Sequence, residues 1–256
     1  MNIVLFSPDE VGNSGDISLP PADPRAVHIR SVLRLEPGAR FRAGIIDGMS
    51  GTAEVRNDRT EGVADNLLLR FLPDRNERTE VLPRVDVILG SVRPIQLKRL
   101  FRDLSSIGVS HIMVAGTDLS EASYFHSNIW KPARLRGFLV EGASQGGHTS
   151  LPEVARSRSI DEAVAACETI YESVGTQAVS RMWLERGARS ASVLPRGKAA
   201  GRILLAIGPE RGFTERETGL LEKAGFEPLG IPVGILRTET AATAAVCIVS
   251  SWSIGP

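Results

Sequence analysis

The chain has 256 residues, of which 42% are hydrophobic and 23% charged, and its 30 basic and 30 acidic side chains leave no formal net charge at pH 7. This composition is ordinary for a soluble globular protein, and the charge balance does not by itself indicate a nucleic-acid partner. The amino terminus lacks a secretory signal, no apolar stretch is long enough for a bilayer, and the two cysteines are far apart, so we expect a cytoplasmic protein without disulfides or a membrane anchor.

Residues 1–72 contain short β-like runs separated by Gly, Asp and Asn, which predicts a small barrel. The runs are Ile3–Phe6, Ala39–Ile46, Gly51–Val55 and Asn66–Leu72. One helical segment, PADPRAVHIRSVLRL, interrupts them, and its spacing predicts a shared apolar face for Val27, Val32 and Leu33. The charged stretch 73–83 has a proline at each end and no periodicity, which is typical of a linker.

From residue 84 onward the pattern alternates between buried strands and amphipathic helices. The run VDVILG predicts a strand, the apolar spacing over 94–108 predicts a helix that stops at Gly108, and HIMVAG predicts the next strand. This order indicates a mainly parallel sheet covered by helices. Further elements are expected as a helix over Asn128–Ala143, a helix capped by Ser159, and strands near Arg181–Leu184, Arg202–Ile207 and Pro228–Ile231.

Several common chemistries have no support in the sequence. The chain contains no G-x-G-x-x-G and no G-x-x-x-x-G-K-[ST], so dinucleotide and P-loop sites are not expected. The letters GASQG (142–146) match G-x-S-x-G, but a solvated helix end explains this segment better than a serine-hydrolase turn, so a serine-hydrolase site is not expected either. Its four histidines are scattered, and neither cysteine has a partner at metal-binding spacing. We therefore expect no metal.

Two loops remain as candidates for a site. The segment IGPERGF (207–213) follows an apolar strand and precedes a capping box formed by Thr214 and Glu217, so it lies where open α/β sheets bind ligands. A ligand-free glycine turn is an alternative for this loop alone. In the second loop, Arg237, Thr238 and Glu239 open an alanine-rich helix that is apolar on nearly all sides. Buried polar groups need partners, and a ligand or a second subunit would supply them.

The segments IGPERGF (207–213) and ILRTETAATAAV (235–246) resemble the signature of the RsmE family, the 16S ribosomal RNA uridine-N3 methyltransferases of the SPOUT class. The amino-terminal half is similar to the family's RNA-binding domain at His28-Ile29, Val32-Leu33-Arg34, Gly38 and Asp47-Gly48. The resemblance implies an α/β fold with a PUA-like RNA-binding β-barrel at 1–72, a linker at 73–83 and a SPOUT methyltransferase domain at 84–256. That domain would have a mainly parallel sheet with a trefoil knot. The resemblance further implies a homodimer, S-adenosyl-L-methionine (SAM) as cofactor with S-adenosyl-L-homocysteine (SAH) as product, and the 16S rRNA of the small ribosomal subunit as partner.

Carried over by position, the resemblance also implies roles for individual residues. The cofactor-binding residues would be Gly208, Pro209, Glu210, Gly212, Ile231, Gly234, Ile235, Leu236 and Ala241. The catalytic residues would be Arg237, Thr238 and Glu239, with Arg237 stabilising uracil oxygens or a phosphate and Glu239 accepting a proton or orienting Arg237. The RNA-binding candidates are Arg30, Arg34, Arg211, Gln145 and His148, although Arg30 and Arg34 are equally well explained as ordinary surface arginines.

Three places depart from the family pattern. Arg211 stands where the usual GPEGG loop has its second glycine, the segment 102–107 reads RDLSSI where the family usually has lysine and glutamate, and His148 replaces an arginine. Arg211 could obstruct the pocket or point outward toward RNA. Two alternatives therefore remain open: a SPOUT methyltransferase for another RNA target or atom, such as a ribose 2′-hydroxyl, and a non-catalytic RNA-binding factor.

Overall fold

The computed structural model describes residues 2–56, 65–74, 82, 84–173, 175, 178–188 and 201–253. The chain divides into two compact units, one made of Met1–Glu80 with Ala143–Leu151 and the other of Val81–Gly142 with Pro152–Pro256. Most of the expected linker 73–83 lies outside the described residues, whereas Pro73 ends a strand. The segment 143–151 groups with the first unit although it is distant from it in sequence.

The first unit is built on a five-stranded sheet in which one strand pair is parallel and the others are antiparallel. In spatial order the strands are β1 (Val4–Phe6), β3 (Arg40–Ile45), β4 (Ser50–Val55), β5 (Leu67–Pro73) and β2 (Asp16–Leu19). Alternate residues of β4 and β5 are buried, so one face of the sheet covers a core that includes Phe6, Leu69 and Phe71. Four strands lie where they were expected, and β2 was not predicted.

The helical segment of the first unit differs from its prediction. A short helix α1 (Pro24–Val27), capped by Asp23, continues as a π-helical turn over His28–Val32. The expected apolar face is wrong: Val27, Val32 and Leu33 are 46%, 65% and 40% exposed, while Ala26 and Ile29 are fully buried. In the widened turn the Leu33 N–H donates to the His28 carbonyl, five residues back. The turn therefore has more than 3.6 residues, and the residues after it point in other directions than a regular α-helix predicts.

The second unit is built on a six-stranded sheet in which every described strand pair is parallel. In spatial order the strands are β11 (Glu227–Leu229), β9 (Val179–Leu184), β10 (Arg202–Ile207), β6 (Val85–Gly90), β7 (His111–Ala115) and β8 (Glu153–Ser157). This confirms the expected mainly parallel sheet. Strand β8 was not predicted, because it is an edge strand without a buried residue.

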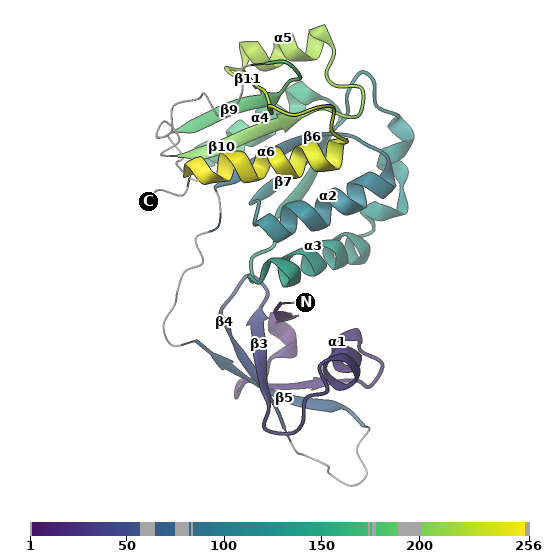
Figure 1. Ribbon diagram of the computed structural model, residues 1–256, viewed down its shortest axis with the longest axis vertical. Coiled ribbons are helices and arrows are strands. Elements are labelled where there is room, and N and C mark those ends of the chain that lie inside the picture. The colour runs from purple at the N-terminus through teal and green to yellow at the C-terminus, as the bar shows by residue number, and fades with distance from the viewer. Residues whose placement is uncertain are drawn as a thin grey trace. The chain divides into compact units, whose positions relative to one another are not determined.

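Helices cover both faces of this sheet (Figure 1). Helix α6 (Thr238–Ser253) runs across the front of β10 and β6 beside α2 (Pro94–Ile107), and α4 (Ile160–Ser173) lies behind the strands. Helix α5 (Glu215–Lys223) shares a core with α4 through Leu221. Among the described residues, no helix combines the length and the hydropathy required to cross a bilayer.

Helix α3 (Pro132–Gly146) packs closely along α2. The Ser105 hydroxyl donates a 2.7 Å hydrogen bond to the Leu139 carbonyl, and a Cβ at Gly142 would collide with the Arg102 carbonyl oxygen. The helix expected from Asn128 begins four residues later, because two short 3-10 turns, Ala122–His126 and Asn128–Trp130, precede it. These turns place the rings of Phe125 and Trp130 next to Arg156 of β8.

A buried polar cluster lies at the amino-terminal edge of the parallel sheet. The Asp86 side chain, in a residue that is 1% exposed, contacts His111 Nδ1 at 2.8 Å and accepts hydrogen bonds from Arg202 Nη1 at 2.9 Å and Tyr171 Oη at 2.9 Å. The hydrogen bond to Asp86 raises the pKa of His111, and burial raises the pKa of Tyr171 far above its ordinary value. The cluster joins β6, β7, β10 and α4 at the edge opposite to the candidate site.

Candidate active site

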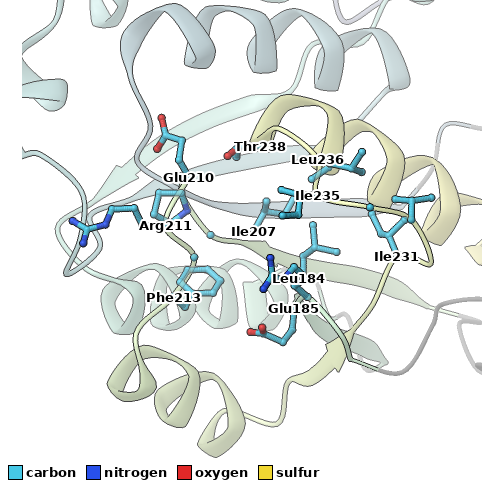
Figure 2. Close-up of a pocket in the computed structure, with 17 residues that line it drawn as sticks. Leu184, Glu185, Ile207, Glu210, Arg211, Phe213, Ile231, Ile235, Leu236 and Thr238 are labelled. Atoms are coloured by element: carbon cyan, nitrogen blue, oxygen red, sulfur yellow. The ribbon is translucent and has the colours of Figure 1, made fainter.

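A cavity of about 400 Å³ lies at the carboxyl ends of β9 and β10 (Figure 2). Three segments line it: residues 184–186 after β9, residues 207–213 after β10, and residues from 231 into the first turn of α6. Carboxyl ends of parallel strands are the usual ligand-binding edge of an α/β sheet. The two loops singled out in the sequence therefore form two walls of one cavity.

The first wall is a tight turn between β10 and α5. The Gly212 N–H donates to the Pro209 carbonyl at 2.9 Å, and Gly212 has a φ of +72°. Gly208 lies so close to Gly212 that an added Cβ would be 3.1 Å from the Gly212 backbone. Both positions favour glycine, one for its conformation and one for space. The turn brings the backbone of this loop to the cavity surface without a side chain in between.

The expected capping box is confirmed at the start of α5. The Glu217 N–H donates to the Thr214 hydroxyl at 3.3 Å, and the Thr214 N–H donates to the Glu217 carboxylate at 2.9 Å. The second carboxylate oxygen of the fully buried Glu217 accepts a 2.8 Å hydrogen bond from the Asp118 N–H. This network ties the β10–α5 turn to the loop that follows β7.

The second wall is the loop that leads from β11 into α6. Within it the Val233 N–H donates to the Ile231 carbonyl at 2.8 Å, and the side chains of Ile231 and Leu236 face the cavity in Figure 2. Helix α6 starts at Thr238, and its first helical hydrogen bond runs from the Ala241 N–H to the Arg237 carbonyl. The first N–H groups of a helix have no helical acceptor and carry partial positive charge. The amino end of α6 thus presents a positive potential to the cavity.

All nine residues expected to bind the cofactor line this one cavity, together with Arg211 and Thr238. The nine are Gly208, Pro209, Glu210, Gly212, Ile231, Gly234, Ile235, Leu236 and Ala241. Ile207 and Phe213 also line it and belong to the candidate loop 207–213, although no role was expected for them individually. The lining residues that were missed in the sequence are Leu184, Glu185, Arg186 and Val233. The end of β9 carries no recognisable motif, and only its position at the carboxyl edge of the sheet could have indicated residues 184–186.

The three expected catalytic residues have different surroundings. Thr238 is buried and lines the cavity, whereas Arg237 is exposed and its guanidinium has no hydrogen bond or ion pair within the described part of the chain. Glu239 is buried but does not line the cavity. Its carboxylate lies 3.3 Å from Arg99 Nη1 and 3.5 Å from Gln96 Nε2, both on α2.

The RNA-binding candidates fall into two groups. Arg211 is on the cavity wall, and Figure 2 shows its side chain pointing outward, away from Leu184 and Ile235, so it does not obstruct the space. The other four lie in the first unit. Arg30 forms an ion pair with Asp65 at 3.4 Å, and Arg34 is exposed. Gln145 is exposed, whereas His148 is buried.

Acidic, cysteine and histidine side chains do not cluster in the described residues in a way that could hold a metal ion. Near the site, burial and the neighbouring Glu239 carboxylate raise the pKa of Asp103 on α2. The cavity is lined by apolar side chains, by the acidic residues Glu185 and Glu210, by the basic residues Arg186 and Arg211, and by the amino end of a helix. This combination suits an amphiphilic organic ligand with hydrogen-bond donors.

Comparison with known proteins agrees with this geometry. Residues 80–250 match the model of the RNA methyltransferase domain family. The chain is 36% identical over 252 residues to the ribosomal RNA small subunit methyltransferase E of Treponema pallidum, which covers 97% of this chain and 90% of that protein. It is 30% identical over 251 residues to the methyltransferase E 1 of Borreliella burgdorferi, which covers 98% of each.

Solved structures share the fold at lower sequence identity. A ribosomal RNA small subunit methyltransferase E from Neisseria gonorrhoeae bound to SAM superposes with a TM-score of 0.71 at 20% identity, over 98% of this chain and 97% of that one. A methyltransferase from Legionella pneumophila in complex with SAM superposes with a TM-score of 0.74 at 20% identity, with the same coverage. From the family match over most of the chain and the identity to the two curated relatives, the chain belongs to the RNA methyltransferase family and, within it, to the ribosomal RNA small subunit methyltransferases E.

Proposed function

We propose that this protein transfers a methyl group from SAM to the N3 atom of a uridine in the 16S rRNA of the small ribosomal subunit. The observation that carries the proposal is the cavity formed by the loops 207–213 and 231–241 at the carboxyl edge of the parallel sheet. The curated relatives are named as small-subunit rRNA methyltransferases, and two structural neighbours contain SAM.

The residues of the cavity fit this cofactor. Its volume of about 400 Å³ lies within the range of small-molecule sites. The apolar side chains of Leu184, Ile207 and Leu236 offer an environment for an adenine ring, and Glu185 and Glu210 can accept hydrogen bonds from ribose hydroxyls or an ammonium group. When bound, SAM supplies an electrophilic methyl group, so the transfer requires no metal.

The chain's own residues would then prepare the uracil. Uracil N3 is a weak nucleophile until its proton leaves, and the negative charge that develops is shared with the ring oxygens. Arg237 stands between two cavity residues, and its guanidinium has no partner among the described residues, so it can bind these oxygens. The amino end of α6 adds positive potential at the same place. We assign Arg237 and Thr238 to stabilising this anion.

Glu239 has two possible roles, as a proton acceptor or as a residue that orients Arg237. Its carboxylate contacts Arg99 and Gln96 on α2, which supports the orienting role, because these contacts fix the first turn of α6. We therefore propose that Glu239 positions Arg237 and that the proton leaves to water or another group.

The same proposal includes the finer features of the fold and assembly. We propose that the cavity loops belong to a trefoil knot, that residues 1–72 form a PUA-like RNA-binding domain with Arg30 and Arg34 among its contacts, and that residues 84–256 form the SPOUT domain. We also propose a cytoplasmic homodimer. In support of the dimer, Val233 and Ile235 in the cavity lining are 58% and 82% exposed, so a second copy could cover them.

The test combines three measurements on purified protein. Isothermal titration measures the affinity and stoichiometry of SAH binding, and the mass in solution gives the oligomeric state. Mass spectrometry of nucleosides from small ribosomal subunits incubated with the protein and SAM identifies the methylated product. We expect one SAH per subunit and 3-methyluridine. A 2′-O-methylated nucleoside would favour the alternative target atom. Absent SAH binding in a folded protein would favour a non-catalytic RNA-binding factor.

The substitution Arg237→Ala examines the chemical assignment. We expect a loss of about a hundredfold or more in methylation rate, as for the removal of other groups that stabilise an oxyanion, with SAH affinity unchanged. Arg134→Ala, at an exposed position of α3, is the matched control and should behave as the wild type. Normal turnover by the Arg237 variant would contradict the assignment.

A further inference from the structure

A second cavity of about 640 Å³ lies in the same unit, at the carboxyl ends of β7 and β8. It is lined by residues that follow these two strands, by the 3-10 turn Ala122–His126 and by Glu162 of α4. Its volume is in the range of small-molecule sites. None of its lining residues belongs to the cavity described above, so its chemistry requires its own explanation.

The polar groups of this second cavity favour an anionic ligand. Arg156, Arg158 and His126 line it against one carboxylate, Glu162, which already accepts a 2.9 Å hydrogen bond from the Arg158 N–H. Within the described residues, the Arg158 guanidinium has no hydrogen bond or ion pair, and the buried Thr117 hydroxyl has no hydrogen-bond partner. The Arg158 guanidinium is therefore the group in this cavity that a ligand anion can bind.

An aromatic stack borders the same space. The rings of Phe125 and Trp130 are parallel within 2°, with centroids 6.2 Å apart, and the Arg156 guanidinium lies 4.9 Å from the Trp130 ring centre. Arg156 Nη1 also donates to the Phe125 carbonyl at 3.2 Å, which fixes the guanidinium in place. Proteins bind single-stranded nucleic acid by stacking its bases on aromatic or guanidinium planes and by pairing its phosphates with cationic side chains.

The loops that line the two cavities are in contact with each other. A Cβ at Gly90 would lie 2.6 Å from Pro209 Cδ and 3.1 Å from Thr117 Cγ2, so side chains from both cavities meet at this glycine. The Asp118 carboxylate next to Thr117 contacts Thr214 and Arg216 at the start of α5. Both cavities therefore lie at the carboxyl edge of one sheet, and an RNA strand bound at the first would have to run along this edge to reach the second.

We propose that this second cavity binds an unpaired nucleotide of the substrate RNA, outside the uridine that is methylated. The base stacks on the Phe125 side, and the phosphate binds Arg158 and Arg156. The site would hold the RNA strand beside the reaction centre and so contribute to substrate selection. The inference rests on the proposed function, because it takes RNA as the substrate.

The principal test is the variant Arg158→Ala, with Arg134→Ala as the matched control. The probe is a short fluorescein-labelled single-stranded RNA with a central uridine, measured by fluorescence anisotropy over a series of salt concentrations. We expect the Kd of the Arg158 variant to rise about tenfold and its salt slope to fall by about 0.7, the value for one lost phosphate contact on a single strand. SAH affinity should remain that of the wild type, which shows that the first cavity is intact.

A crosslinking measurement tests the site in the unmodified protein. RNA containing 4-thiouridine next to the central uridine is irradiated with the wild type, and crosslinked peptides are identified by mass spectrometry. We expect crosslinks within residues 116–126 or 156–162. Unchanged RNA affinity of the Arg158 variant, or an equal loss in the Arg134 control, overturns the proposal, as does crosslinking confined to other segments.

The measurements distinguish a failure of the proposed reaction from a failure of the nucleotide site. Absent methylation by the wild type, together with Arg158-dependent RNA binding, would refute the reaction and retain the nucleotide site. Competition by inorganic phosphate alone, without any RNA crosslink in the cavity, would show a simple anion site and refute the nucleotide assignment.

Discussion

Replacing Asp86 by Asn removes the charge at the centre of the buried cluster while nearly keeping the size of the side chain. The change leaves the Arg202 guanidinium without its carboxylate and weakens the hydrogen bonds from His111 and Tyr171. Removal of one partner of a buried ion pair costs about 3–5 kcal/mol. The side chains of Arg202 and His111 are 21% and 23% exposed, so water compensates part of the loss. We expect a decrease of about 3 kcal/mol in the free energy of unfolding.

The pH dependence of this decrease in stability tests the same ion-pair assignment independently. Asp86 raises the pKa of His111 in the folded protein, so the stabilisation from this pair is complete below the pKa of an unfolded histidine, about 6.5. It is lost as the pH rises through the raised folded pKa. The wild type should therefore lose stability over that range and Asp86→Asn should not, so the difference between them narrows as the pH rises.

Urea denaturation followed by tryptophan fluorescence measures both quantities, because Trp183 is buried in the same core as Tyr171. Asp161→Asn, at an exposed position in the first turn of α4, is the control. The SAH affinity of the folded Asp86→Asn variant, measured without urea, should be that of the wild type, because the cluster and the cavity are at opposite edges of the sheet. A loss of less than about 1 kcal/mol at every pH, or a difference that widens with pH, would refute the reasoning.

Two further changes test the surroundings of the site. Thr214→Ala removes the hydroxyl of the capping box and should lower the free energy of unfolding by about 1 kcal/mol in urea titrations, while Thr218→Ala, one turn later in α5, should have a smaller effect. Asp103→Asn should raise the urea concentration at the midpoint of unfolding at pH 7, because burial and Glu239 raise the pKa of Asp103 and so disfavour its charged form. The advantage should disappear below about pH 4, where unfolded aspartate is also protonated, and an advantage that persists there would contradict this assignment.

The parts of the fold that follow from local pattern were predictable. Strand β10, helix α2 with its stop at Gly108, and the Thr214 capping box depend on apolar spacing and on side chains that are close in sequence. The edge strand β8 was missed, because an edge strand without buried residues lacks an apolar period. The face of the 27–33 segment was wrong, because one π-helical turn changes the spacing on which the prediction depends.

The candidate site shows the same division. The two motif loops carry their own glycines and helix start, so their residues could be named before their positions were known. The contribution of β9 came from a strand without a motif, and the second cavity is assembled from two segments, 116–126 and 156–162, that helix α3 separates in the chain. The orientation of Glu239 toward Arg99 depends on the packing of α6 against α2.

By itself, then, the sequence determined the parallel α/β class, the two motif loops and the resemblance to a methyltransferase family, because these depend on short-range spacing and residue type. Only the tertiary structure decided that both loops face one cavity, that Arg211 points outward, and that Arg158 and Phe125 line a second cavity beside an aromatic stack. Those relations arise when strands distant in sequence pair in register and bring their carboxyl ends to one edge of the sheet.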